Sequence, residues 1–214
     1  MKGVIFDLDG TLLNSNALVK KIYEELIKIY PSDVSFESLD LNFVFASGYP
    51  EVLEKLYRHV KPEYMKMIHQ LHEKMRSSYL SLFKGVKTML HDLKEEGYYI
   101  GLLTSELHQI AEEELKMLDA LSFFDYIVGF DDVIKPKPHP EGLLKHLAYS
   151  NLSPKDLIYV GDQIRDAEAA KACDVFVILA DWNLDKGSLM SVYFDQTVSK
   201  IDELIAMIHQ RKNA

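Results

Sequence analysis

The sequence predicts an α/β protein whose doubly wound parallel sheet is interrupted by an all-helical insert. Five short apolar runs each end in a polar residue or a turn, as expected for parallel strands that are covered on both faces. From about residue 84 onward, helical patterns alternate with these runs, which favours a sheet flanked by helices. Only helical patterns lie between the first run and that point. The insert is therefore expected to form a small domain of its own.

The five expected strands are marked by nearly continuous hydrophobicity rather than by alternation of apolar and polar residues. A weaker sixth run covers Val192–Phe194. Because turn or polar residues follow the five runs, each strand has a defined carboxyl end. The five runs are Gly3–Phe6, Tyr99–Leu103, Tyr126–Phe130, Leu157–Val160 and Phe176–Leu179.

Helices are expected between the strands. In the segment 86–96, apolar residues recur on one face, and Gly97 can end the helix. The segment Leu107–Leu118 is amphipathic, and its acidic first turns suit the positive end of the helix dipole. Three further helices are expected at Pro140–Ser150, Asp166–Cys173 and Ile201–Gln210.

The insert spans residues 16–82 and contains no run that is typical of a strand. The chain returns to the sheet at Phe83-Lys84-Gly85-Val86, where Gly85 marks a turn. We therefore expect a core domain of residues 1–15 and 83–214 and a helical domain of residues 16–82. The expected helices of the insert are Ala17–Tyr30, Glu51–His59 and Glu63–Leu82.

Composition excludes several classes of function. Of the 214 residues, 48% are hydrophobic and 27% are charged, which is the balance of an ordinary globular protein. The formal net charge of −9 argues against a nucleic-acid binder, although a small anionic substrate could still bind in a locally positive pocket. The single cysteine, Cys173, excludes an intramolecular disulfide.

The same reading predicts a cytoplasmic protein without membrane contact. The apolar run at the start of the chain is too short for a signal peptide. No uncharged stretch approaches the roughly 20 residues that span a bilayer. A monomer is expected by default, with a dimer left open.

Chemistry-bearing residues follow the expected strands. In an open parallel sheet, ligands bind outside the carboxyl ends of the strands. Carboxylates, hydroxyls and a lysine all fall at this edge. A lone aspartate there is usually a helix cap or a turn residue, but the joint pattern is much harder to produce by chance. The residues are Asp7, Asp9, Thr104, Ser105, Lys137, Asp162 and Asp166.

Four motifs contain these residues. Asp7-Leu8-Asp9-Gly10-Thr11 follows the first strand, and Thr104-Ser105 follows the second. Lys137-Pro138-His139-Pro140 is the third motif, and Gly161-Asp162-Gln163-Ile164-Arg165-Asp166 is the fourth. With these motifs in this order, the chain resembles the haloacid dehalogenase (HAD) superfamily of phosphatases over essentially its whole length. The resemblance implies a HAD-like, Rossmannoid core with an inserted helical cap.

The insert is similar to the small helical cap of the subfamily that contains phosphoglycolate phosphatase, pyrophosphatases and β-phosphoglucomutase. Ser47-Gly48-Tyr49-Pro50 lies where that cap carries its specificity loop, which implies substrate contacts from Gly48 and Tyr49. The sequence Asp131-Asp132-Val133 before the third motif looks most like phosphoglycolate phosphatase or the pyrophosphatases. Four departures from the family pattern leave the catalytic groups in place: Asn14, Lys84, Gln163 and Asp174. Asp174 replaces a helix-ending glycine, and aspartate can adopt the left-handed conformation at some cost.

The resemblance implies a Mg²⁺-dependent phosphatase for a small phosphorylated metabolite, such as a phosphoglycolate-like monoester or pyrophosphate. Asp7 is expected to attack phosphorus and form an aspartyl phosphate. Asp9 is expected to protonate the leaving oxygen and later to deprotonate the attacking water. The implied metal ligands are Asp7, the backbone carbonyl of Asp9, and Asp162. Asp166 is expected to orient Lys137 or a metal-bound water.

Charge also indicates a cation. Three ionised carboxylates and a phosphate dianion carry five negative charges, of which Lys137 and a divalent ion offset three. Backbone N–H and hydroxyl groups of Gly10, Thr11, Thr104 and Ser105 are expected to bind phosphate oxygens. Hard carboxylate oxygens together with phosphate favour Mg²⁺.

Several residues have a competing interpretation. Lys135 also precedes a proline, but the register of the residues that follow favours Lys137 as the catalytic lysine. Arg58 and His139 are candidates to touch substrate, and His139 is equally well explained as a loop residue. His69 and His72 are expected on a solvated helix face, and Cys173 is expected in buried packing.

Three alternative functions remain open at this point. A sugar phosphomutase would share every motif and return the phosphoryl group to the sugar. A haloacid dehalogenase would need neither the Asp9 carboxylate nor a metal, which argues against it. A phosphate-sensing or partner-binding module could retain the fold, but it would not require the complete catalytic set.

Overall fold

The computed structural model describes residues 2–183 and 190–212, which form two compact units. One unit contains the chain up to Asn14 and from Leu82 onward, and the other contains Ser15–Ser81. No helix among the described residues is long and apolar enough to cross a membrane.

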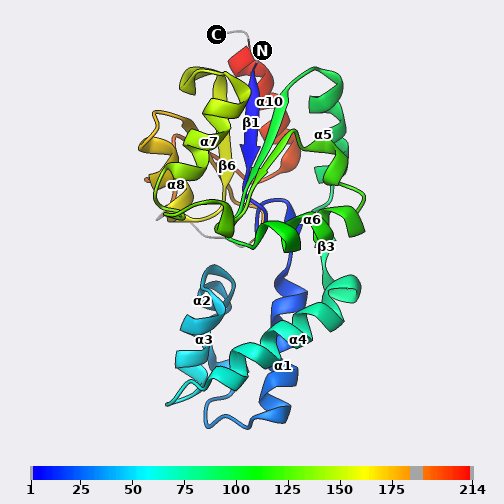
Figure 1. Cartoon of the computed structure of the whole chain (residues 1–214), viewed down its shortest axis with the longest axis vertical. Helices are drawn as coiled ribbons and strands as arrows, with labels where there is room; N and C mark the ends of the chain where they lie inside the picture. Colours follow the sequence, from blue (N-terminus) through cyan, green and yellow to red (C-terminus); the bar gives the residue numbers. More distant parts are fainter. Residues whose placement is uncertain (1, 184–189, 213–214) are drawn as a thin grey trace. The chain divides into compact units, whose positions relative to one another are not determined.

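Within the described residues, the first unit contains a six-stranded parallel sheet in the order β5-β4-β1-β6-β7-β8 (Figure 1). All residues of β1, β4 and β6 are buried, as the continuous apolar runs predicted. The predicted α/β fold with a doubly wound parallel sheet is therefore confirmed. The strands are β1 Gly3–Phe6, β4 Tyr99–Leu103, β5 Tyr126–Val128, β6 Leu157–Gly161, β7 Phe176–Ala180 and β8 Gln196–Val198.

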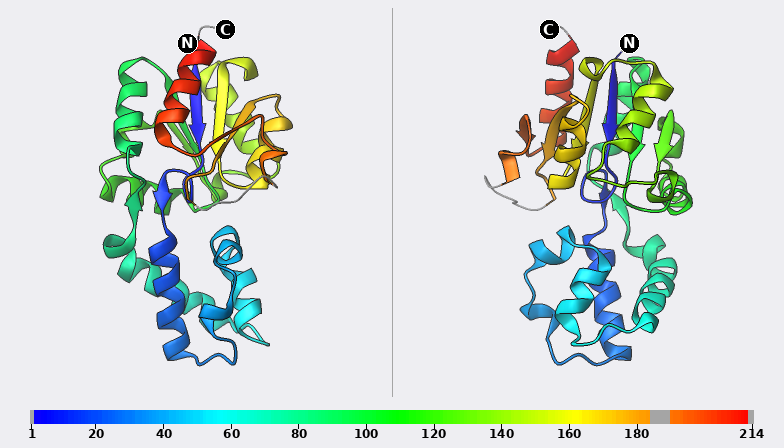
Figure 2. Two further views of the ribbon diagram at one scale, coloured as in Figure 1. Left: turned by 180° about the vertical axis from the view of Figure 1, so that it is seen from behind. Right: turned by 60° about the vertical axis from the view of Figure 1, so that its left-hand side comes forward.

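Helices cover both faces of this sheet. Helices α5 and α10 contact each other on one face, and α7 and α8 contact each other on the opposite face (Figure 2). Both arrangements place the apolar stripe of each helix on the strands. The helices are α5 Val86–Glu95, α6 His108–Met117, α7 Glu141–Ser150, α8 Ile164–Lys171 and α10 Ile201–Lys212.

The position of β1 determines where a ligand can bind. The chain runs from β1 to its neighbour β4 and on to β5, and then crosses to the other neighbour of β1, which is β6. Because the strand order reverses at β1, the loops after β1, β4 and β6 lie side by side at the carboxyl edge of the sheet.

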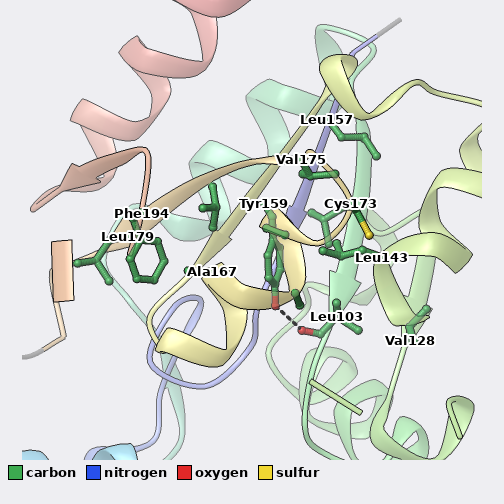
Figure 3. Packing of buried hydrophobic residues seen from close by; sticks show 14 of the residues in the cluster. Leu103, Val128, Leu143, Leu157, Tyr159, Ala167, Cys173, Val175, Leu179 and Phe194 are labelled. Atoms are coloured by element: carbon green, nitrogen blue, oxygen red, sulfur yellow. Dashed lines mark hydrogen bonds between the residues drawn. The ribbon is translucent and has the colours of Figure 1, made fainter. Parts of the chain in front are cut away.

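One hydrophobic cluster of this unit lies between the sheet and the helices α7 and α8. Tyr159 of β6 is at its centre, surrounded by Leu103, Leu143 and Ala167 (Figure 3). Cys173 is 8% exposed and belongs to the same cluster, which confirms its predicted role in packing. At the end of α8, Asp174 has a φ of 56°, so this aspartate adopts the left-handed conformation expected for the missing glycine.

The second unit is helical. Helices α1 and α4 pack against each other through buried residues spaced about one turn apart, such as Leu18 and Ile22 of α1 and Tyr64 and Ile68 of α4. The short strands β2 (Leu13–Asn14) and β3 (Ser81–Leu82) pair with each other and flank the insert in sequence. The helices are α1 Asn16–Ile29, α2 Leu41–Ala46, α3 Tyr49–Leu56 and α4 Pro62–Tyr79.

Three of the differences from the sequence-based expectation concern strands. The strand expected at Tyr126–Phe130 ends at Val128, because the Phe130 N–H donates to the Glu106 carbonyl instead of continuing the ladder. The run Val192–Phe194 is not a strand; the sixth strand is the more polar β8, which lies at the edge of the sheet. Ser81–Leu82 forms the short strand β3 inside the segment expected to lack strands.

A fully buried histidine connects α7 to β4. The Nε2 atom of His146 lies 3.0 Å from the Leu102 carbonyl oxygen, and its Nδ1 atom lies 2.7 Å from the Tyr99 hydroxyl. Because a carbonyl can only accept, Nε2 carries the proton and Nδ1 accepts from the tyrosine. Burial lowers the pKa of His146 to about 4, although the bond to Leu102 raises it by a smaller amount.

We predict that His146→Gln makes the protein less sensitive to acid. Below about pH 6.5 the unfolded chain binds a proton at His146, whereas the folded protein excludes it until about pH 4, so stability falls as the pH falls through this window. The full difference is worth at most about 3 kcal/mol. Urea unfolding at about pH 7 and about pH 4.5 should show a smaller loss for the variant. In a His59→Gln control, which changes an exposed histidine of the helical unit, the loss of stability should equal that of the wild type.

Candidate active site

Residues of the first, third and fourth motifs come together at the carboxyl edge of the sheet. Asp7 directly follows β1, Asp162 directly follows β6, and Lys137 lies in the loop between β5 and α7. Asp166 is in the first turn of α8. All four side chains are buried, and that of Lys137 is only 3% exposed. The structure therefore brings Asp7, Lys137, Asp162 and Asp166 together.

The Lys137 ammonium is the centre of this group. Its Nζ atom lies 2.7 Å from Asp7 Oδ1 and 2.7 Å from Asp166 Oδ1. The same atom lies 3.1 Å from the Tyr159 hydroxyl and 3.3 Å from the Leu103 carbonyl oxygen. Lys135, in contrast, is exposed. Between the two candidate lysines, only Lys137 is close to the carboxylates.

Asp166 has a complete set of hydrogen-bond donors. Its Oδ1 atom accepts from Lys137 and from the Tyr159 hydroxyl at 3.0 Å. Its Oδ2 atom accepts from the backbone N–H groups of Asp162 at 3.1 Å and Gln163 at 2.9 Å. A carboxylate offers about four lone-pair sites, and all are used here. This arrangement suits an orienting role for Asp166 better than direct metal binding.

Three carboxylates could hold a metal ion at this edge. Oxygen atoms of Asp7, Asp162 and Asp166 lie within 4.8 Å of one another. With Lys137 protonated, the three carboxylates and one ammonium carry a net charge of −2, which a divalent cation would balance. Since Asp166 is already engaged by four donors, Asp7 and Asp162 are the carboxylates that fit such an ion best.

Burial and charge shift the pKa values of these groups. Burial raises the pKa of Asp7 to about 7; Lys137 opposes this shift, whereas Asp166 and Asp162 add to it. Burial lowers the pKa of Lys137, but Asp166 and Asp7 together raise it above its ordinary value. Burial raises the pKa of Asp166, yet Lys137 and the Gln163 N–H outweigh burial and hold it below its ordinary value. Lys137 and Asp166 are therefore a stable ion pair.

The loop of the first motif packs closely against Asp162. Gly10 has a φ of +77°, and a Cβ atom there would lie 2.2 Å from Asp162 Oδ2, so only glycine fits. The Leu8 carbonyl accepts from the N–H groups of Thr11, Leu12 and Leu13, which makes the loop compact. The side chain of Asp9 is exposed, in contrast to that of Asp7.

The other expected phosphate-binding residues differ in exposure. Thr104 is buried, and its hydroxyl oxygen accepts from the Glu106 N–H at 3.0 Å. Ser105 is exposed at the same edge. Thr11 is buried, and its hydroxyl has no hydrogen-bond partner among the described residues. Their roles in binding phosphate stay predictions.

The loops after β4 and β5 are joined by hydrogen bonds. The His108 N–H donates to Asp131 Oδ1 at 2.8 Å, and His108 Nδ1 lies 2.5 Å from Asp132 Oδ2. These contacts fix the loop of Thr104 against the loop that leads to Lys137. The aspartates that the sequence marked as family-like thus support the position of the third motif.

The contacts expected between substrate and residues of the helical unit stay predictions. Gly48 caps the start of α3, and the ring of Tyr49 lies 5.9 Å from that of Tyr23, a cap-packing contact. Arg58 is exposed in the same unit. In the sheet unit, His139 is an exposed loop residue before α7, and its Nδ1 accepts from the Glu141 N–H at 3.2 Å.

The described geometry agrees with comparisons to known proteins. The model of the haloacid dehalogenase-like hydrolase family matches residues 4–180. The chain belongs to this family. Pyrophosphatase PpaX of Bacillus cereus (strain B4264) is 29% identical over 210 residues, covering 96% of this chain and 95% of PpaX.

Solved structures share the complete fold. A Thermotoga maritima protein assigned as a beta-phosphoglucomutase has a TM-score of 0.80 and 25% identity, covering 98% of this chain and 99% of that one. A protein of Haemophilus somnus 129pt, predicted to be a phosphoglycolate phosphatase, has a TM-score of 0.80 and 19% identity, covering 97% of each chain. The second likeness shows the fold alone.

The sequence did not predict a role for two side chains of this hydrolase that contact the site residues. The hydroxyl of Tyr159 contacts both Lys137 and Asp166, although the sequence presents it only as part of an apolar strand. The single tryptophan, Trp182, donates from Nε1 to the Thr11 carbonyl at 3.1 Å and so holds the loop of the first motif. Tyr159 lies in the middle of β6 and Trp182 lies two residues after β7, so the polar atom on each aromatic ring is the only sequence signal for either residue.

We predict that replacing Lys137 destabilises the hydrolase, whereas replacing Lys135 does not. Lys137→Met keeps the volume of the side chain but leaves Asp7 and Asp166 as buried charges without their cation, which costs about 3–5 kcal/mol. Lys135→Met changes an exposed side chain and should stay within about 0.5 kcal/mol of the wild type. Urea unfolding at about pH 7 measures both, and equal stability of the two variants would contradict the central place of Lys137.

Proposed function

We propose that this hydrolase is a Mg²⁺-dependent phosphatase that acts on a small phosphorylated metabolite through an aspartyl-phosphate intermediate. The observation that carries the proposal is the buried group of Asp7, Lys137, Asp162 and Asp166 at the carboxyl edge of the sheet. A phosphoglycolate-like monoester or pyrophosphate is the proposed substrate. The similarity to a pyrophosphatase over 96% of the chain supports the second of these.

The proposed cation would be held by Asp7, Asp162 and the backbone carbonyl of Asp9. Bound Mg²⁺ supplies positive charge that offsets the phosphate and orients it for in-line attack. Its fit rests on the net charge of −2 and on oxygen donors within 4.8 Å of one another. Asp166 would contribute indirectly by holding Lys137 in place.

Asp7 is the proposed nucleophile. Its carboxylate oxygen forms a bond to phosphorus while the bond from phosphorus to the leaving oxygen breaks. Asp9 gives its proton to that leaving oxygen. In the second step Asp9 takes a proton from water, the water oxygen attacks phosphorus, and the bond to Asp7 breaks to release inorganic phosphate. The exposed position of Asp9 suits a group that exchanges protons with substrate and water.

Lys137 would balance charge on the transferring phosphoryl group. Its ammonium already contacts Asp7, so a phosphoryl group on that carboxylate would come within reach of the same cation. The N–H groups of Gly10 and Thr11 and the hydroxyls of Thr104 and Ser105 are proposed to bind the remaining oxygens. The helical unit is proposed to act as a cap that selects the leaving group through Gly48 and Tyr49.

A sugar phosphomutase is the second candidate. The similarity to the Thermotoga maritima protein assigned as a beta-phosphoglucomutase favours it, because that protein shares the whole fold. The two functions differ in the fate of the phosphoryl group. Release of inorganic phosphate supports the phosphatase, and an isomerised sugar phosphate without release supports the mutase.

We predict that Asp7→Asn reduces phosphate release by at least about 10³-fold, because an amide oxygen is a poor nucleophile. Activity should be measured with Mg²⁺ on pyrophosphate, phosphoglycolate, sugar phosphates and nucleotides. A chelator should abolish the wild-type activity, and Mg²⁺ should restore it. Asp92→Asn is the matched control, since Asp92 is exposed on α5. Wild-type activity in Asp7→Asn would contradict the aspartyl-phosphate route.

We further predict that the loss caused by Asp9→Asn depends on the leaving group. An alkyl phosphate needs its leaving oxygen protonated, so kcat/KM should fall by about 10²–10⁴-fold. p-Nitrophenyl phosphate releases a stable anion, and its kcat/KM should fall less than about tenfold. Because kcat/KM reports the steps up to leaving-group departure, the comparison isolates the acid role. Equal losses for both substrates would argue against Asp9 as the general acid.

A further inference from the structure

One side chain of the catalytic group does not belong to any of the four motifs. Tyr159 lies in the middle of β6 and is fully buried, with its ring packed among Leu143, Ala167 and Leu103 (Figure 3). Its hydroxyl lies 3.1 Å from Lys137 Nζ, 3.0 Å from Asp166 Oδ1 and 3.3 Å from the Leu103 carbonyl oxygen. The ring is therefore part of the core, whereas the hydroxyl is part of the site.

The direction of each hydrogen bond follows from the groups involved. An ammonium can only donate, so Tyr159 accepts from Lys137. The single proton of the phenol is then available to Asp166, which is closer than the Leu103 carbonyl and carries a charge. Lys137 has three protons, and Asp7, Asp166 and Tyr159 are its three nearest acceptors.

Tyr159 also preserves the charge of the group. Burial, and then the carboxylates of Asp166 and Asp7, raise its pKa well above the ordinary value, so the phenol stays neutral. A carboxylate in its place would change the net charge from −2 to −3 and would no longer match a divalent ion. A phenylalanine would leave the third proton of Lys137 with only the more distant Leu103 carbonyl as its acceptor, at 3.3 Å. A neutral acceptor on a rigid ring satisfies both requirements.

We propose that Tyr159 is a positioning residue for phosphoryl transfer, which acts by holding the Lys137 ammonium against Asp7. The inference rests on the proposed phosphatase function. Tyr159 is 0% exposed, so it cannot touch substrate and affects the reaction only through Lys137 and Asp166. Its loss should therefore change kcat much more than KM.

Tyr159→Phe is the direct test. The variant keeps the ring, its packing and the contact of Lys137 Nζ at 5.9 Å from the ring centroid, and removes only the hydroxyl. We expect kcat to fall about tenfold, the effect of one hydrogen bond, with KM within about twofold of the wild type. Steady-state rates should be measured with Mg²⁺ on pyrophosphate and p-nitrophenyl phosphate, well below the thermal midpoint.

Tyr99→Phe is the matched control. Tyr99 is also a buried strand tyrosine, the first residue of β4, and its hydroxyl lies 2.7 Å from Nδ1 of His146 on α7, at the opposite end of the strand from the catalytic group. This variant should lose stability and keep kcat within about twofold of the wild type. A wild-type kcat in Tyr159→Phe, or an equal loss of kcat in both variants, would overturn the proposal.

A second measurement does not require turnover. The ¹⁵N signal of the buried Lys137 ammonium, assigned by its absence in Lys137→Met, reports how fast its protons exchange with water. We expect faster exchange in Tyr159→Phe and unchanged exchange in Tyr99→Phe. No turnover by the wild type on any substrate would reject the proposed function. Unchanged exchange together with unchanged kcat would reject the role of Tyr159 alone.

Discussion

The buried ammonium of Lys137 is the interaction on which the rest of the site depends. A lysine that is 3% exposed is tolerated only because carboxylates and neutral oxygens surround it. Asp7 and Asp166 each lie 2.7 Å away, and the pair Lys137–Asp7 joins residues 130 positions apart in the chain. When all three carboxylates are ionised, the group has a net charge of −2 that no residue within it balances. A divalent cation is the natural complement.

The sheet topology brings these distant residues to the same place. Asp7 and Asp162 follow two strands that are paired residue by residue, from Gly3 with Leu157 to Phe6 with Val160. This register fixes the separation of the two aspartates, because neighbouring strands lie about 4.8 Å apart. Asp166 lies in the first turn of α8, and its Oδ2 accepts from the backbone N–H groups of Asp162 and Gln163, the two residues before that helix. Backbone geometry therefore places all three carboxylates.

Most strands and most of the buried site residues could be predicted from the sequence, because they follow local patterns. Features that depend on long-range contacts could not. Continuous apolar runs identified five strands, but β8 is a short edge strand whose polar residues give no such signal. The strand after Tyr126 ends early because Gly129 and Phe130 bond to side chains and loops, which a local pattern does not encode. Lys137 could be chosen over Lys135 by register. Tyr159 and Trp182 could not be identified, since their roles depend on long-range contacts.

The contrast between buried and exposed site residues indicates where selectivity resides. Four buried residues of the sheet unit contact one another: Asp7, Lys137, Tyr159 and Asp166. One protein similar to this chain is named a pyrophosphatase, and another is assigned as a beta-phosphoglucomutase. The structure of the second shares the fold of this chain with a TM-score of 0.80. A fold that is shared by proteins with different names does not by itself determine the substrate. The exposed side chains of Asp9 and Ser105, outside the buried group, are the places in the sheet unit where such differences can arise.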